Sequence, residues 1–224
     1  MPPTATLEDI KAHQKKIEKD KILPDNLPPC PCCNVDSTLF KIHAYRRRRF
    51  LIIVKMLIKK IYCDLVRFRC PDCGKTFTDY PDFAIPHKHY TRPTITGFSD
   101  RYVESDNMTY QQAVMVDNSV PGYPVSDPTE APTLAPTTIH RWITTLSGFT
   151  RTRQTALNLL LQENPVLTIC RDLAQLTVGQ RKYRSDQRKR QLIGCLELMI
   201  IKAFFKTTFK ISIFTELAIR CGFN

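Results

Sequence analysis

The sequence has few of the features that mark secreted, membrane-spanning or nucleotide-hydrolysing proteins. Residues 1–21 are polar and rich in lysine and contain no apolar signal-peptide core, which predicts a cytoplasmic protein in a reducing environment. The longest apolar stretch, Leu192 to Phe214, is interrupted by Glu197 and three lysines, so it predicts a buried helix and no membrane span. The chain has only seven glycines, and none forms a phosphate-cradling loop.

Acidic residues are also scarce. Lysine and arginine number 33 against 21 aspartates and glutamates, and the formal net charge of +12 favours a polyanionic partner, nucleic acid first and an acidic membrane surface second. DNA-cutting enzymes use clustered carboxylates to hold two metal ions. The carboxylates of the C-terminal third are scattered, and Glu197 is expected to pair with a basic residue. We therefore expect no enzymatic activity, with a metal-dependent nuclease as the third alternative.

The chain does contain nine cysteines, and four of them form two hooks. The first hook is Cys30-Pro31-Cys32-Cys33, and the second is Cys70-Pro71-Asp72-Cys73-Gly74. Four thiolates in two such pairs can close a tetrahedral zinc site that leaves no open position for water. The predicted ligands of a structural Zn²⁺ ion are Cys30, Cys33, Cys70 and Cys73. Cys32 is interpreted as a bystander, although a register with Cys32 in place of Cys33 stays open. Four further cysteines lie in apolar contexts and are expected to be core residues: Cys63, Cys170, Cys195 and Cys221.

The residues between the hooks favour β-structure. Segments 38–54 and 61–69 are rich in β-branched and aromatic residues, which predicts a hairpin that joins two metal knuckles, as in a zinc ribbon. Four consecutive arginines, 46–49, lie in the first strand, where side chains alternate between faces. At most two of them can share a face, and we expect Arg47 and Arg49 to contact DNA.

The remainder of the chain is mostly helical in pattern, which makes the expected fold class α+β. Thr109 and Gln112 form a capping-box pattern at the start of a short helix. Thr137 is the expected N-cap of a later helix over 137–149. Further helices are expected at 7–21, 92–104, 151–163, 166–177, 190–206 and 212–221. The predicted segments are an N-terminal basic helix and linker (1–27), the ribbon (28–90), a DNA-binding region with a proline-rich loop at 117–136 (91–149) and a helical region (150–224).

The helix at 137–149 is amphipathic. Ile139, Ile143 and Leu146 share one face, with Trp142 beside them. The other side presents groups that can contact bases and phosphates: Thr137, Thr138, His140, Arg141 and Thr145. An ordinary surface helix would show the same periodicity. A basic run over 181–190 separates two predicted helices, and it supplies the further candidate DNA contacts Arg188, Lys189 and Arg190.

Two parts of the chain resemble a known family. Residues 137–143 are similar to the recognition helix of transposase-type helix-turn-helix domains, and residues 109–113 are similar to the helix before it. The hook at 30–33 and the run 67–77 resemble the zinc ribbon of insertion-sequence transposases and related bacterial proteins. The resemblance covers roughly residues 28–149 and implies bacterial origin and sequence-specific DNA binding.

The resemblance has one departure. A helix-turn-helix joins its helices by three or four residues, whereas the proline-rich segment 117–136 intervenes here. Either this segment is an insertion that leaves the helices packed, or the pair is not a true motif.

The leading hypothesis is therefore a zinc-binding protein, related to transposases, that binds double-stranded DNA. The alternative is a zinc-stabilised interaction module whose apolar C-terminal helices dock a transposase or another partner, or self-associate.

Overall fold

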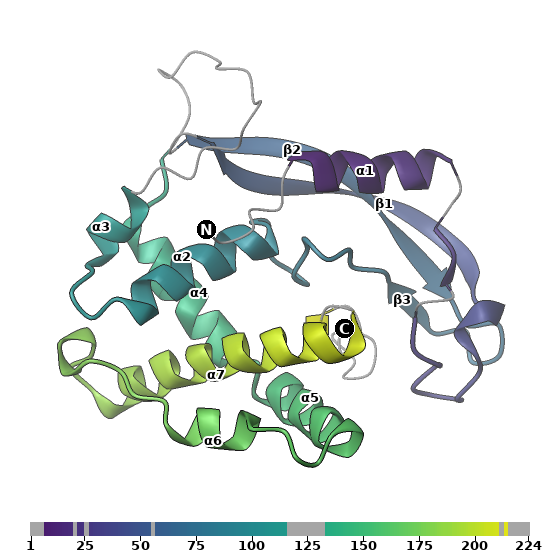
Figure 1. The fold of residues 1–224 in the computed structure, drawn as a ribbon. Helices are drawn as coiled ribbons and strands as arrows, with labels where there is room; N and C mark the ends of the chain where they lie inside the picture. Colours follow the sequence, from purple (N-terminus) through teal and green to yellow (C-terminus); the bar gives the residue numbers. More distant parts are fainter. Residues whose placement is uncertain are drawn as a thin grey trace. The chain divides into compact units, whose positions relative to one another are not determined.

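The chain has an α+β fold, as predicted (Figure 1). The computed structural model describes residues 7–19, 22–24, 27–54, 57–115, 133–210 and 213–214. The chain divides into two compact units, which are treated separately below. The cysteine unit comprises residues 5–52, 60–92 and 211–224, and the helical unit comprises residues 1–4, 53–59 and 93–210.

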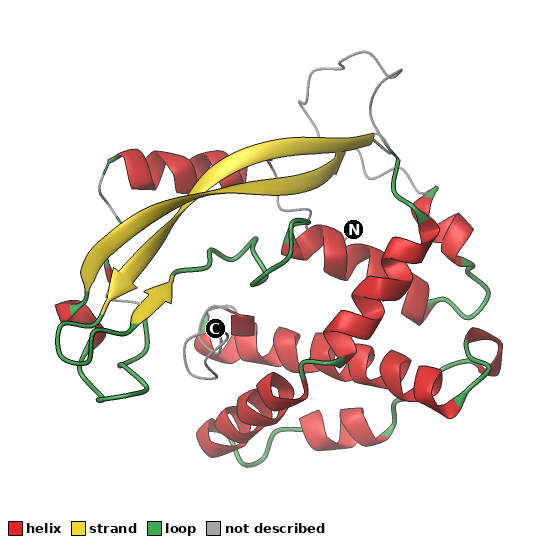
Figure 2. Cartoon of the chain, turned by 180° about the vertical axis from the view of Figure 1, so that it is seen from behind, coloured by secondary structure: helices red, strands yellow, loops and turns green. Residues whose placement is uncertain are grey.

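Most of the cysteine unit is a β-ribbon with one helix. Its elements are α1 (Leu7–Glu18), the 3-10 helix η2 (Ser37–Leu39), β1 (Lys41–Val54), β2 (Leu57–Arg69) and β3 (Thr76–Thr78). The ends of β1 and β2 that fall within residues 53–59 belong to the helical unit. The strand order is β1-β2-β3 (Figure 2), and β3 runs antiparallel to β2 with Phe77 opposite Phe68. Both predicted strands are present. The second begins at Leu57, earlier than expected, and β3 was not predicted because three residues carry too little periodic signal.

The core of the cysteine unit joins α1 to the sheet. Ile10 and Ile17 lie two turns apart on α1, so both fall on its buried face. Ile17 belongs to the cluster that includes Phe40, Val66 and Phe68. Cys63 is buried, as expected for a cysteine in an apolar context.

The helical unit is assembled around one long helix. Its elements are α2 (Arg92–Glu104), α3 (Tyr110–Val114), α4 (Pro136–Ser147), α5 (Thr150–Glu163), α6 (Ile169–Ala174), the 3-10 helix η3 (Gln180–Lys182) and α7 (Asp186–Phe209). Helix α7 packs against α4, α5 and α6. It buries Leu192, Cys195, Leu198, Ile201 and Phe205 at helical spacing. Each leucine, isoleucine or phenylalanine side chain among these contributes about 1.5–3 kcal/mol when fully buried.

A network of polar groups fixes the contact between α5 and α7. Arg153 donates hydrogen bonds to the carbonyls of Ser147 and Gly194. Its Nε also lies 3.5 Å from Oε2 of Glu197, as expected for a carboxylate in an apolar helix. Glu197 therefore has a structural partner.

Several local expectations are corrected or confirmed. The N-cap of α4 is Ala135, and Pro136 occupies the first helical position, which its fixed φ suits. The predicted cap, Thr137, therefore lies inside the helix. The capping box of Thr109 and Gln112 is confirmed, with both reciprocal hydrogen bonds present. Cys170 is exposed and is not the core residue that was expected.

The C-terminal predictions also differ in extent. The helix expected at 166–177 is limited to Ile169–Ala174. The basic run does not separate two helices, because residues 186–190 form the first turn of α7. Most of the predicted proline-rich loop (residues 117–132), the end of the chain after 214 and Cys221 lie outside the described residues. None of the helices in the described ranges is long and apolar enough to cross a membrane.

Candidate metal centre and basic surfaces

The two hooks bring four cysteines together. The sulfur atoms of Cys30, Cys33, Cys70 and Cys73 all lie within 4.8 Å of one another. Sγ of Cys30 is 3.5 Å from Sγ of Cys73, and Sγ of Cys33 is 3.5 Å from Sγ of Cys70. A tetrahedral site with metal–sulfur bonds of about 2.3 Å places its ligands about 3.8 Å apart, whereas a disulfide requires about 2.05 Å. The cluster therefore has the dimensions of a four-thiolate metal site, and Cys32 is exposed outside it.

The two hooks share one backbone conformation. In the first hook, the Cys30 amide donates to the Val35 carbonyl at 2.9 Å, and the Asn34 amide donates to the Cys30 carbonyl at 2.8 Å. The second hook repeats both hydrogen bonds at the equivalent positions, from Cys70 to Lys75 and from Gly74 to Cys70. These bonds turn the two thiols of each hook toward one point.

Each hook needs one residue with a left-handed backbone. Asn34 has φ 59° and Gly74 has φ 70°. Most L-residues avoid this region because Cβ approaches the following carbonyl oxygen, while glycine adopts it freely and asparagine tolerates it. The sequence places a suitable residue directly after each second cysteine.

The cluster is buried on one side only. Cys30 and Cys70 are buried in the apolar cluster beside Phe68, while Cys33 is exposed and Cys73 is half-buried. The ring of Phe77 stacks on Phe40 with 5.4 Å between centroids and extends this apolar floor. With four thiols as ligands, the centre has no position for a substrate and suits a structural role.

The thiols of the cluster oppose one another's ionisation. The hydrogen bond from the Val35 amide lowers the pKa of Cys33, but desolvation and the other three thiols raise it to about 12. A cation at the centre would favour the thiolates, so metal binding and thiol ionisation are coupled.

Helix α4 presents a row of exposed polar side chains. Thr137, His140, Arg141 and Thr144 are exposed, and Thr138 and Thr145 are half-buried at the edge of the row. The opposite face is buried through Ile139, Trp142, Ile143 and Leu146, as the sequence predicts. Desolvation and the charge of Arg188 both lower the pKa of His140, which favours the neutral imidazole near pH 7.

The basic run at 181–190 divides into structural and exposed residues. Lys182 is 8% exposed and donates hydrogen bonds to the carbonyls of Tyr102 and Met108. Its role is to fix the turn between α2 and α3. Lys189 is half-buried, with Nζ 5.6 Å from the ring centroid of Tyr183. Among the predicted contacts of this run, Arg188 and Lys189 are half-buried and Arg190 is exposed.

Arg188 ties three helices together. Its guanidinium donates hydrogen bonds to the Tyr110 hydroxyl of α3, to Oε1 of Gln191 at 2.8 Å and to Oγ1 of Thr144 at 3.3 Å. The imidazole of His140 packs edge-on against the Tyr110 ring, with 5.9 Å between the ring centroids. The structure thus brings the predicted residues His140 and Arg188 into one site. Sequence reasoning missed Tyr110, although the capping box placed it at the start of its helix.

The hairpin arginines alternate between faces, as the strand period requires. Arg48 is half-buried and donates hydrogen bonds to the carbonyls of Ile85 and Lys88, at 3.2 and 2.6 Å. Arg47 and Arg49 point to the other face and are exposed. The Arg47 guanidinium lies 5.5 Å from the ring centroid of Tyr62 on β2. This pair belongs to the cysteine unit, whereas the α4 row and Arg188 belong to the helical unit.

The fold and the cluster define an α+β protein with a candidate four-cysteine metal centre. One protein-family model, described as a domain of unknown function (DUF6431), matches residues 30–118. The match begins at Cys30, includes both hooks and the hairpin, and ends before α4. No curated protein and no solved structure matches the chain.

Proposed function

We propose that this chain is a zinc-binding protein that binds double-stranded DNA, that it is related to insertion-sequence transposases, and that it has no catalytic role of its own. The exposed row Thr137, His140, Arg141 and Thr144 on α4 is the observation that carries this proposal. These residues follow the spacing i, i+3, i+4 and i+7, so they form one continuous stripe. The net charge of +12 also favours a nucleic-acid partner.

The chemistry of the cluster supports zinc as the metal. Thiolates are soft ligands, and a tetrahedral set of four thiolates selects zinc or an iron–sulfur cluster. The similar backbone conformation of the two hooks holds the sulfurs at separations close to those around a single zinc ion. Zinc in this site stabilises the hairpin and takes no part in a reaction.

The stripe on α4 suits a DNA groove. An α-helix about 10–12 Å in diameter fits the major groove, which is about 12 Å wide. Arg141 offers a bidentate donor to guanine, while Thr137 and His140 can reach base edges or phosphates. Helix α3 packs against α4, which supports the interpretation that the proline-rich segment is an insertion between two packed helices.

Exposed basic residues outside α4 supply candidate phosphate contacts. Arg47 and Arg49 lie on one face of the hairpin, and Arg190 lies on the first turn of α7. Each phosphate contact adds about 0.9 to the slope of log affinity against log salt concentration. Replacing both Arg47 and Arg49 by glutamine should therefore lower that slope by about 1.8, if both contact DNA.

A comparison of two arginine variants tests the proposal. A duplex sequence would first be selected with the zinc-loaded full chain, and the affinities of Arg141→Gln and Arg171→Gln would then be measured by fluorescence anisotropy. Arg171 is an exposed arginine on α6 and serves as a control for the lost charge. Loss of a bidentate base contact costs about 1–3 kcal/mol, so Arg141→Gln should bind the selected sequence about 5- to 150-fold more weakly. Equal affinities for the two variants would contradict the role of α4.

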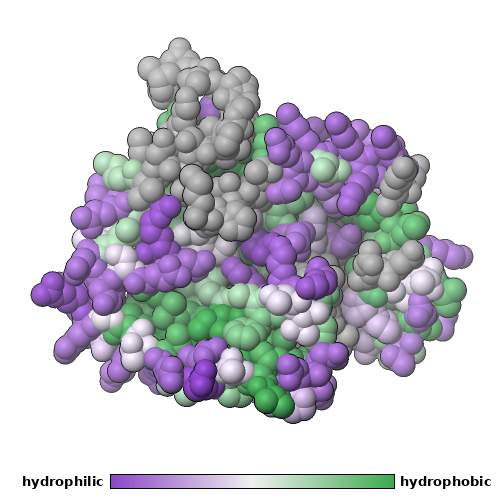
Figure 3. All heavy atoms as spheres, viewed as in Figure 1, coloured by the Kyte–Doolittle hydropathy of each residue, from purple (hydrophilic) through white to green (hydrophobic). Residues whose placement is uncertain are grey.

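One observation favours a second candidate function, the docking of a protein partner. On the face seen in Figure 3, hydrophobic side chains gather over the helical unit in the area of α7. Half-buried apolar residues of α7 include Ile193, Leu196 and Ile200. Analytical ultracentrifugation of the full chain over a range of concentrations tests self-association. A monomer at all concentrations would argue against self-association through this surface.

A further inference from the structure

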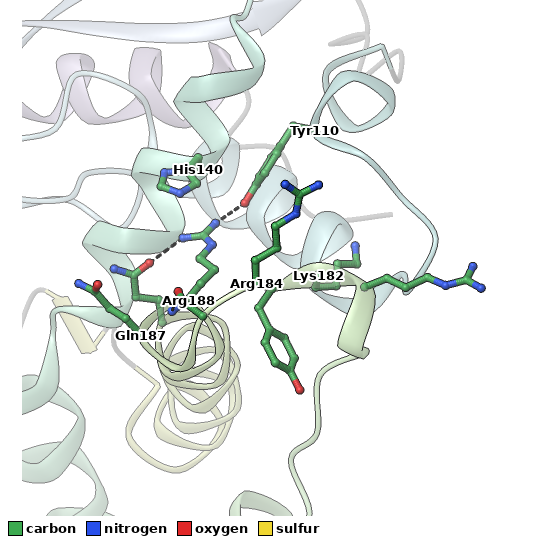
Figure 4. A pocket seen from close by; sticks show the side chains of 10 residues that line it. Tyr110, His140, Lys182, Arg184, Gln187 and Arg188 are labelled. Atoms are coloured by element: carbon green, nitrogen blue, oxygen red, sulfur yellow. Dashed lines mark hydrogen bonds between the residues drawn. The ribbon is translucent and has the colours of Figure 1, made fainter.

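A basic hollow lies beside α4 in the helical unit (Figure 4). Its volume is about 500 Å³, within the range of ligand pockets. The side chains that matter here come from α3, α4, the segment before α7 and the first turn of α7: Tyr110, His140, Arg181, Arg184, Gln187 and Arg188. Among the described residues, no aspartate or glutamate lines it. Arginines that share a hollow without a carboxylate repel one another, and a bound anion relieves that repulsion.

The guanidinium of Arg188 is held in a fixed position inside this hollow. Figure 4 shows it close to His140 and Tyr110, with a hydrogen bond to the Tyr110 hydroxyl. A second hydrogen bond joins it to Oε1 of Gln191. An arginine whose rotamer is already fixed loses little entropy when it binds a ligand. Within the described part of the chain, three of its five N–H groups bind Thr144, Gln191 and Tyr110, so Nε–H and one proton of Nη2 remain, already oriented, for an anion.

Arg184 supplies a second guanidinium. In Figure 4 its side chain extends alongside Tyr110, from the segment just before α7. Arg184 is exposed, and among the described residues no hydrogen bond or ion pair of its side chain is found. The planar donor set of this side chain is therefore available to a ligand, and such a fork matches the geometry of phosphate oxygens.

The first turn of α7 borders the same hollow. Ser185 caps this 24-residue helix by accepting a hydrogen bond from the Arg188 amide at 3.2 Å, and Gln187 lines the hollow. Asp186, the first helical residue, carries the nearest carboxylate in sequence but does not line the hollow. The positive end of the helix dipole adds to the attraction for an anion that the two arginines create.

We infer that this hollow binds a phosphate group, with Arg184 and Arg188 as its guanidinium donors and the Tyr110 hydroxyl as a further polar contact. A phosphate in the DNA backbone and a free phosphate share this chemistry. The assignment to a backbone phosphate rests on the proposed function. Arg188 touches the α4 row through its hydrogen bond to Thr144 and lies close to His140 (Figure 4). A phosphate held there would fix the register of α4 on a duplex.

The first experiment compares Arg184→Gln with Arg171→Gln in the full chain. In salt titrations of duplex binding, Arg184→Gln should lower the slope of log affinity against log salt by about 0.9. Arg171→Gln should leave the slope equal to that of the wild type. Arg184 is exposed, so the variant should keep the wild-type fluorescence of Trp142, the single tryptophan. A slope for Arg184→Gln equal to that of the control overturns the assignment to a backbone phosphate.

The second experiment uses inorganic phosphate and pyrophosphate in place of DNA, with binding measured by isothermal titration calorimetry. Saturable binding to the wild type that is lost in Arg184→Gln supports the hollow as a phosphate site, even if the chain binds no duplex and the proposed function fails. If the wild type binds duplex DNA but Arg184→Gln changes neither the salt slope nor phosphate binding, the inference is wrong while the proposed function stands.

Discussion

The two units of this chain obtain their order from different sources. In the cysteine unit, the four thiols connect residues 30–33 to residues 70–73, and two of these thiols lie in the apolar cluster itself. In the helical unit, α7 buries a ladder of apolar side chains against α4, α5 and α6. We therefore expect the fold of one unit to depend on a metal ion and that of the other to depend on packing.

The largest expected effect is the loss of the metal. Cys70→Ser or a strong chelator should unfold the cysteine unit, because structural zinc contributes on the order of 10–16 kcal/mol of apparent binding energy in small modules. Zinc content and circular dichroism would measure this loss. The fluorescence of Trp142, which is buried in the helical unit, should stay unchanged. Cys32→Ser is the matched control, since Cys32 lies outside the cluster. A single melting transition whose midpoint is the same with and without the chelator would contradict the expected metal dependence of the cysteine unit.

The second prediction concerns packing in the helical unit, which Leu198→Ala should weaken without affecting the metal site. Leu198 is fully buried on α7, and removing its side chain leaves a cavity that should cost the helical unit about 2–5 kcal/mol. Thermal unfolding followed by Trp142 fluorescence should shift to lower temperature while zinc content stays constant. Leu196→Ala on the half-buried side of α7 should cost less. Release of zinc by Leu198→Ala would show that the units do not fold independently.

The third prediction concerns pH and the helical unit. Burial raises the pKa of Asp100 to about 6 from an ordinary 3.8, with Lys202 opposing this shift and Glu104 adding to it. The folded unit therefore holds a proton that the unfolded chain releases, so its stability should fall as pH rises from about 4 to 6. Asp100→Asn should remove this dependence and raise the stability at pH 7.5 by about 2–3 kcal/mol.

Trp142 melting curves at several pH values measure the Asp100 effect. Glu163→Gln provides the control, because Glu163 is exposed at the end of α5. If the wild type is equally stable at pH 4.5 and pH 7, Asp100 does not have the raised pKa.

The smallest expected effect is a difference in zinc affinity between substitutions at equivalent positions of the two hooks. Gly74 has φ 70°, and alanine in this left-handed region costs about 1–2 kcal/mol, so Gly74→Ala should weaken zinc affinity roughly 5- to 30-fold. At the equivalent position, Asn34→Gly should leave the affinity unchanged or raise it slightly, since glycine adopts φ 59° without strain. A competition titration against a chelator of known affinity compares the two variants. Equal losses would mean that the hooks do not share the conformation described here.

The sequence predicted best what local chemistry determines. Residue spacing placed the cysteine hooks, periodicity placed the buried face of α4, and the expected bounds of 92–104 coincide with α2. The alternation of arginines 46–49 was expected from the strand period. The sequence did not show that Arg48 would be the arginine whose guanidinium binds the carbonyls of Ile85 and Lys88.

The site residues that were missed depend on contacts between distant segments. Lys182 is 80 residues away in the chain from Tyr102, whose carbonyl accepts its hydrogen bond. The contact between Arg188 and Tyr110 spans a separation of 78 residues. The sequence of the basic run 181–190 does not indicate that Lys182 is buried or that Arg188 hydrogen bonds to Tyr110. Only the packing of α3, α4 and α7 distinguishes these structural cations from the exposed ones.

The most direct test of the proposed function is a salt titration of duplex binding by the zinc-loaded full chain, with binding measured by fluorescence anisotropy. Affinity for the duplex should fall linearly on a log–log scale between about 50 and 200 mM salt, with a slope of several units, because each phosphate contact adds about 0.9. Absent binding, or an affinity that does not change with salt, would contradict the account.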